Sequence, residues 1–186
     1  MSTKQILIAV VALTGAFALS STASSPNNTV KPGETYGGAK DVAFAGKVWK
    51  AMEGYQGWKL STDLFRGVSP HGKYVREYST WVTVGKEIYP VIVKDNYGGR
   101  GVTEDGIKAD PETWHKSVTF MVQRERGYDT EGRDWFYAKY EHGELARAKD
   151  GKPLAGRIGK GETRGGCVSC HSQAADGDFL YSNDPE

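Results

Sequence analysis

Four segments in the middle of the chain are rich in β-branched and aromatic residues, and they restrict the possible folds more than any other feature. The segments are residues 73–84, 88–94, 117–123 and 134–140. Residues of these types favour extended strands. Glycine-containing turns separate the segments, at residues 96–99, 127–129 and 142–143. The pattern predicts a mainly antiparallel β-sheet and excludes a four-helix bundle.

One long helix is expected ahead of these strands. Its apolar residues recur at three- and four-residue spacing after Asp41, and they are Val42, Phe44, Ala45, Val48, Trp49 and Met52. This spacing places them on one side of a helix that ends near Gly54. Together, the helix and the strands predict an α+β fold.

The first 40 residues are expected to be a targeting segment and a linker. Lys4 precedes an apolar run and then the small residues 21–23, a pattern typical of a secretory signal peptide. An uncleaved membrane anchor is the alternative, but Thr14 and Gly15 interrupt the apolar run. The sequence therefore predicts three parts, which are a signal peptide at 1–23, a flexible leader at 24–40 and one domain at 41–186.

The charge balance argues against a nucleic-acid or lipid partner. The chain has 24 Lys and Arg against 23 Asp and Glu, and Lys4 is the one charged residue of the expected signal peptide. Its removal leaves the two signs balanced. Nucleic-acid and anionic lipid surfaces attract basic patches. We expect no nucleic-acid partner, and no membrane contact after signal cleavage.

The segment Cys167-Val168-Ser169-Cys170-His171 is the attachment signature of c-type haem. In a short C-terminal helical turn the two thiols share one face, so each can form a thioether with a porphyrin vinyl group while His171 binds the iron. A redox dithiol is the alternative, but such a pair is expected early in a βαβ unit. The signature predicts one covalent haem c in a periplasmic or secreted protein, because this haem is attached outside the cytoplasm.

Few residues are available as a sixth iron ligand. Only 15 residues follow His171, and they include neither Met nor His. The upstream candidates are Met52, Met121, His71, His115 and His142. Met52 is expected in the core, and the three histidines are expected at the surface or in turns. The sequence therefore predicts a five-coordinate iron with an open sixth position.

Several pieces of the chain, in order, resemble the cytochrome P-460 and cytochrome c′-beta family. The pieces are residues 52–58, 69–72, 89–97, 118–129, 134–137, 167–171 and 178–180. Members of that family fold as an antiparallel sheet with a few helices around one c-type haem. The resemblance implies that Cys167 and Cys170 are the thioether attachments and that His171 is the proximal ligand.

The resemblance also gives Lys94 a role, because cytochromes P-460 have a lysine bonded to the porphyrin edge at the matching position. That bond requires an uncharged amine, and a desolvated lysine at a strand end loses its proton more readily than an exposed one. The alternative is an ammonium group in water or paired with a haem propionate. Lys94 is therefore a candidate cross-link.

The side chains over the open iron face form a further set of candidates. Enzymatic family members use a carboxylate there, and the matching position lies near Thr119. No carboxylate falls at that position, and Glu125 approaches only if the strand register differs. Thr119, Phe120 and Met121 are candidate distal-pocket residues, with plain sheet core as the alternative. Trp135 is expected near the haem.

Three functions follow from the resemblance and the haem signature. The first is oxidation of hydroxylamine, which a distal base would assist. The second is binding of nitric oxide or carbon monoxide without turnover, and the missing carboxylate favours it. The third is simple electron transfer. The expected partners are a small gaseous or nitrogen-oxide ligand and a periplasmic redox protein, and a homodimer is a further expectation.

Overall fold

The computed structural model describes residues 36–162 and 165–181 of the chain. The signal peptide expected at 1–23 lies outside the described residues, as does the leader up to residue 35. Within the described part of the chain, no helix is long and apolar enough to cross a membrane.

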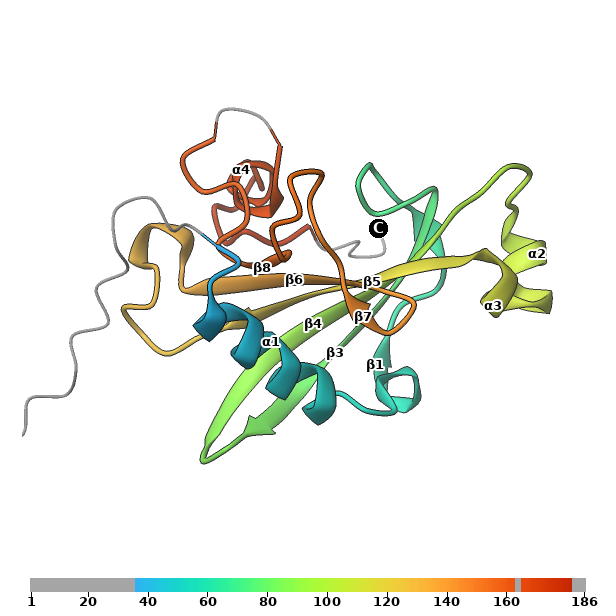
Figure 1. The fold of residues 1–186 in the computed structure, drawn as a ribbon. Helices are drawn as coiled ribbons and strands as arrows, with labels where there is room; N and C mark the ends of the chain where they lie inside the picture. The colour runs from blue at the N-terminus through green and yellow to red at the C-terminus, as the bar shows by residue number, and fades with distance from the viewer. Residues whose placement is uncertain (1–35, 163–164, 182–186) are drawn as a thin grey trace, which may run out of the picture.

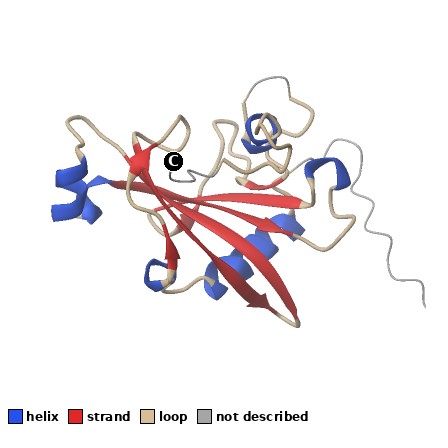
Figure 2. Cartoon of the chain, turned by 180° about the vertical axis from the view of Figure 1, so that it is seen from behind, coloured by secondary structure: helices blue, strands red, loops and turns tan. Residues whose placement is uncertain are grey.

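An antiparallel sheet of eight strands forms the centre of the described structure (Figures 1 and 2). Its long strands are β3 (Tyr74–Val84), β4 (Glu87–Tyr97), β5 (His115–Gln123) and β6 (Trp135–Glu141). Its short strands are β1 (Leu60–Ser61), β2 (Phe65–Arg66), β7 (Glu144–Leu145) and β8 (Ala155–Gly156). The order is β1-β3-β4-β5-β6-β7, with β2 paired to β3 and β8 paired to β6. The four strands predicted from the sequence are confirmed.

Strand β4 is longer than the sequence predicts. It continues past Lys94 to Tyr97, into the glycine-containing turn that was expected at 96–99. Asn96 pairs with Val75 of β3 on one side and with Ser117 of β5 on the other. Because neighbouring strands satisfy both edges of its backbone, this segment stays extended. Lys94 therefore lies inside a central strand, and the prediction that it ends a strand is wrong.

Four α-helices and two 3-10 turns accompany the sheet in the described residues. They are α1 (Ala39–Ala51), η1 (Tyr55–Gly57), α2 (Glu104–Ala109), α3 (Pro111–Trp114), η2 (Thr130–Gly132) and α4 (Cys167–His171). Helix α1 is the predicted long helix. It begins two residues inside the expected leader and ends three residues before Gly54, whose φ of +76° is left-handed. The fold is α+β and is not a helical bundle, as the sequence predicts.

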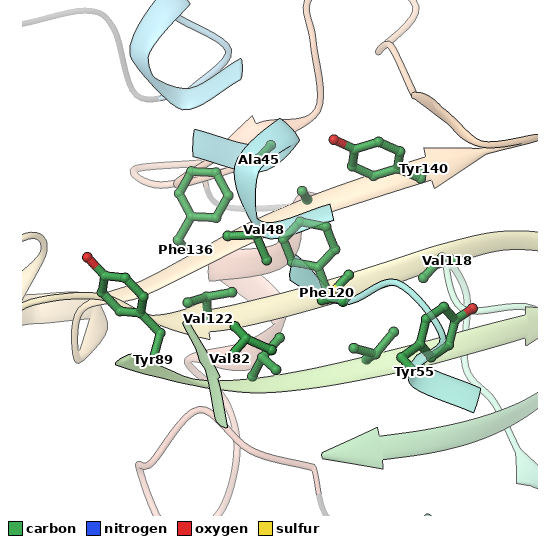
Figure 3. Close-up of a cluster of buried hydrophobic side chains, with 14 of the residues drawn as sticks. Ala45, Val48, Tyr55, Val82, Tyr89, Val118, Phe120, Val122, Phe136 and Tyr140 are labelled. Atoms are coloured by element: carbon green, nitrogen blue, oxygen red, sulfur yellow. The ribbon is translucent and has the colours of Figure 1, made fainter. Parts of the chain in front are cut away.

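The main core lies between α1 and one face of the sheet (Figure 3). Val48 and Phe136 are fully buried there, and the ring of Trp49 stacks on Tyr140 with centroids 4.1 Å apart. Met52 belongs to this core, so the prediction that it fills the core is confirmed. Side chains alternate along each strand, so every second residue of β4, β5 and β6 faces away from α1.

A second core covers the opposite face of the sheet. Its buried members are Met121, Trp135, Tyr137, Ile158 and Phe179, and Cys167 packs against them. Three of them come from β5 and β6, and the other two come from the chain on either side of α4. Helix α4 and helix α1 therefore lie on opposite faces of the sheet (Figure 1).

Candidate functional site

Helix α4 carries the expected attachment residues on the second face of the sheet. Cys167 is half-buried and Cys170 is exposed, and both are free thiols. They are three positions apart in the sequence, so they lie about one helical turn apart on the same side of α4. The helix ends at His171, whose side chain is buried. The sequence motif thus forms the short helix that was predicted for it.

The ring of His171 is held in a single tautomer. Its Nδ1 lies 2.6 Å from the backbone carbonyl oxygen of Phe179. A carbonyl oxygen only accepts, so Nδ1 carries the proton and donates it, which leaves the lone pair on Nε2. Burial lowers the pKa of His171, and the ring is neutral at pH 7. A neutral imidazole whose Nδ1–H is bound to a carbonyl is the usual form of a metal ligand.

The backbone of Phe179 is strained where it binds His171. Its φ is +69°, in the left-handed region that bulky residues rarely adopt. The indole Nε1 of Trp135 donates to the neighbouring Asp178 carbonyl oxygen at 3.1 Å and anchors the same segment. Strain of this kind persists where surrounding contacts hold it, and it is common at functional sites. Trp135 packs in the same core as Cys167 of α4, and its position near a haem stays a prediction.

Two glycines fix the start of α4 against the preceding chain. The Gly159 and Gly166 backbones cross so closely that a Cβ on Gly166 would lie 2.4 Å from the Cα of Gly159. The Val168 amide donates to the Ile158 carbonyl oxygen at 2.9 Å across the same crossing. The absence of a Cβ on Gly159 and Gly166 therefore allows close backbone packing at the start of α4.

The central strands supply a floor beneath α4. The pairing places Ile92 of β4 opposite Met121 of β5, and Met121 opposite Tyr137 of β6. In the next row on the same face, Lys94 lies opposite Thr119. All five residues line one cavity together with Cys167 and His171. The structure therefore brings the candidate residues Lys94, Thr119 and Met121 next to the attachment motif.

Phe120 and Glu125 have different positions from these candidates. Phe120 borders the cavity, but its ring stacks on Tyr140 at 5.9 Å in the main core, on the α1 side of the sheet (Figure 3). Strand alternation accounts for this position. Glu125 follows the end of β5, is about half exposed, and binds Arg124 at 2.8 Å. Glu125 does not line the cavity.

Lys94 is buried and ion-paired. Its Nζ lies 3.2 Å from Oε2 of Glu77, the residue opposite it on β3. Only 8% of Lys94 is exposed. The sequence leaves two alternatives open for Lys94, a porphyrin cross-link and a charged ammonium group. Burial favours the cross-link. The ion pair with Glu77 favours the ammonium group, which a cross-link would have to lose.

His71 lies in a turn, as the sequence predicts, and its amide donates to the Val68 carbonyl oxygen at 2.8 Å. Its side chain is not at the surface, because the half-buried ring lines the cavity, 6.2 Å from the His171 ring between centroids. Burial, followed by the charge of Lys94, lowers the pKa of His71 to about 4. The ring is therefore neutral at pH 7.

The position of His71 depends on contacts far along the chain. Its Nδ1 lies 3.2 Å from Oδ1 of Asn96 and 3.1 Å from Oγ1 of Thr119. Gly72, at φ +84°, packs against β4 so tightly that a Cβ would lie 2.6 Å from the Tyr97 carbonyl oxygen. No local pattern around residue 71 indicates these contacts. The only signal in the sequence is the Pro-His-Gly piece of the resemblance.

The other two histidines lie away from the cavity. His115 was expected at the surface, but it is half-buried, and its Nε2 lies 3.1 Å from Oδ1 of the buried Asp95. Asp95 also accepts a hydrogen bond from the hydroxyl of Tyr55, on the α1 side of the sheet. His142 is exposed in a turn, as predicted. Neither His115 nor His142 lines the cavity beside α4.

The residues around α4 fit a haem better than a redox dithiol. Burial, followed by the neighbouring Cys170, raises the pKa of Cys167 to about 12, whereas redox-active thiols have a lowered pKa. The hydroxyl of Tyr137 is buried and has no hydrogen-bond partner among the described residues, beside the cavity that it lines. The site therefore brings together two thiols on one helical face, an imidazole in a single tautomer and a buried hydroxyl.

Comparisons with protein-family models, curated proteins and solved structures found no match.

Proposed function

We propose that this protein is an exported monohaem c-type cytochrome of the P-460 and c′-beta type that binds small nitrogen ligands, nitric oxide above all. Cys167 and Cys170 would attach the porphyrin, and His171 would bind the iron. The single observation that carries the proposal is the His171 ring, whose Nδ1–H donates to Phe179 at 2.6 Å on the helix that bears both thiols. That arrangement prepares Nε2 for a metal.

The chain's own residues would control how a small ligand reaches the iron. The haem supplies an iron atom that binds small molecules through nitrogen, oxygen or carbon. Ile92 and Met121 give the cavity an apolar wall that excludes water, and Thr119 and Tyr137 add hydroxyl groups. Lys94 lies on the same wall and is paired with Glu77 at 3.2 Å, so a propionate would share the lysine with that carboxylate.

Ligand binding is favoured over hydroxylamine oxidation because the cavity lacks a carboxylate. Among the described residues that line it, there is neither Asp nor Glu. Glu77, which lies opposite Lys94 on β3, is ion-paired with that lysine. Oxidation of hydroxylamine releases protons, and a positioned base speeds such steps by about 10² to 10⁴ fold.

Electron transfer to a periplasmic partner is the second candidate function. It is favoured by His71, a second neutral imidazole that lies 6.2 Å from the His171 ring between centroids. Two strong ligands keep the iron geometry similar in both oxidation states, which suits electron transfer. We also propose that the protein is exported, that it exchanges electrons with a periplasmic redox partner and that it forms a homodimer.

The haem assignment is tested by expression with haem-attachment machinery. The purified chain should carry one haem that survives denaturation and organic extraction, and the double variant Cys167→Ala, Cys170→Ala should lose it. Ser169→Ala, a change at the middle of the motif, is the matched control and should keep the haem. Absence of covalent haem in the wild-type protein would end the proposal.

The reaction class and the cross-link are tested on the same sample. Nitric oxide should change the absorption spectrum, while hydroxylamine with an electron acceptor should give no steady turnover. Sustained acceptor reduction would move the protein to the enzymatic class. A ferrous Soret band shifted far to the red, and lost in Lys94→Ala, would establish a Lys94 cross-link, and an unshifted band would exclude it.

A further inference from the structure

His71 and His171 present two imidazole rings to the same cavity. They are a hundred residues apart in the sequence, on the loop before β3 and at the end of α4. Their ring centroids are 6.2 Å apart and their planes cross at 75°. Both rings line the cavity together with Cys167.

The hydrogen bonds around Asn96 fix the tautomer of His71. The Nδ2 of Asn96 donates to the carbonyl oxygens of Lys94 at 3.2 Å and Ser117 at 3.1 Å, groups that only accept. The Oδ1 of Asn96 therefore faces His71, so the His71 Nδ1 carries the proton and donates it. The lone pair of His71 lies on Nε2, as it does in His171.

Each imidazole is thus held in the way that metal-bound histidines are held. Nδ1–H donates to an oxygen of the protein, and Nε2 is left without a proton. Two imidazoles on opposite sides of one metal ion, each bonded at about 2 Å, have ring centroids about 6 Å apart. The observed separation of 6.2 Å matches that arrangement.

We propose, as an extension of the haem assignment, that His71 is the second axial ligand of the iron and that it must leave the iron before nitric oxide binds. The bond from the His71 Nε2 to the iron breaks, and a bond to the nitrogen of the ligand takes its place. No electron is gained or lost in this exchange. The sixth position that the sequence predicts to be open is then occupied and exchangeable.

The resting coordination state tests this inference without any assay of activity. The purified ferric protein should give the low-spin electron paramagnetic resonance spectrum of an iron with two imidazole ligands. His71→Ala should convert it to high spin, and added imidazole should restore low spin. The control His142→Ala changes an exposed histidine and should leave the spectrum as in wild type.

Three results would overturn the inference. The first is a high-spin wild-type protein, and the second is an unchanged low-spin spectrum in His71→Ala. The third is an unchanged spectrum in His71→Met, because a His and Met ligand pair should change the spectrum and raise the reduction potential. The wild-type spectrum needs no variant, so a variant that fails to fold does not leave the inference undecided. If the haem assignment itself were wrong, the purified wild-type protein would contain no covalent haem, so the two failures can be told apart.

Ligand kinetics give an independent test on the ferrous protein. In wild type the rate of carbon monoxide binding should level off at high concentration, because departure of His71 becomes limiting. In His71→Ala the rate should stay linear in carbon monoxide, and the apparent affinity should rise about tenfold if about one molecule in ten of the wild type is open. A wild-type rate that stays linear throughout would contradict an exchangeable His71 ligand.

Discussion

Replacing Gly159 by alanine should specifically loosen the attachment helix. Gly159 has a φ of +78°, and a Cβ there would lie 2.5 Å from the carbonyl oxygen of Gly165 and 2.7 Å from the Cα of Gly166. Both neighbouring atoms belong to the backbone, so no side-chain rotation relieves the contact. The α4 segment must move away from residue 159.

Gly161→Ala is a matched control for this substitution. Its φ of +80° is nearly the same, but no atom of the described residues beyond its chain neighbours lies within 4 Å of the added Cβ. In both variants the free energy of unfolding should fall by about 1 to 2 kcal/mol, because alanine disfavours the left-handed backbone. In Gly159→Ala the free energy of unfolding should fall by about a further 1 to 3 kcal/mol, the usual cost of overpacking. The difference between the two variants isolates the close crossing of the two backbones.

The effect can be measured globally and at the crossing itself. In a domain of this size, 1 kcal/mol lowers Tm by about 2 to 4 °C, so Gly159→Ala should melt several degrees below Gly161→Ala. The Val168 amide, bound to the Ile158 carbonyl oxygen, should exchange its hydrogen faster in Gly159→Ala, and covalent haem yield should fall. Equal stabilities and equal exchange in the two variants would refute the packing argument.

Three further predictions concern the rest of the fold. Phe136→Ala should lower the free energy of unfolding, measured in urea, by about 3 to 5 kcal/mol because the ring is fully buried. Trp81→Ala, at a site 69% exposed, should keep the free energy of unfolding within about 0.5 kcal/mol of wild type. Thr103→Ala should cost about 0.5 to 2 kcal/mol, because its hydroxyl accepts from the Gly106 amide at the start of α2. Burial, followed by the charge of Asp95, raises the pKa of Tyr55 and Tyr97 in the folded state above the usual value of 10.0. The unfolded chain loses these protons first, so the stability present below pH 10 should fall as pH rises above it. A urea midpoint that is the same at pH 9 and pH 11 would contradict this.

Local sequence patterns were sufficient for the principal elements. Runs of β-branched and aromatic residues predicted the four long strands, and apolar residues at helical spacing predicted α1. The C-x-x-C-H motif predicted the short helix α4. Helices α2 and α3 were missed because segments of six and four residues are too short to show a helical period. Their caps, Thr103 and Asp110, together with Pro111 at the start of α3, are local signals of where they begin.

The sequence by itself determined the kind of fold and the position of the C-x-x-C-H motif, because strand propensity, helical period and motif spacing are all local. Only the tertiary structure decided what lies near that motif. His71 and His171 are a hundred residues apart, and they meet because Gly72 lets one loop pack on β4 while Gly159 and Gly166 seat α4. The register of β4 and β5 then sets Asn96 and Thr119 beside His71. Contacts of this kind depend on strand register and close packing between distant segments, which no local pattern records.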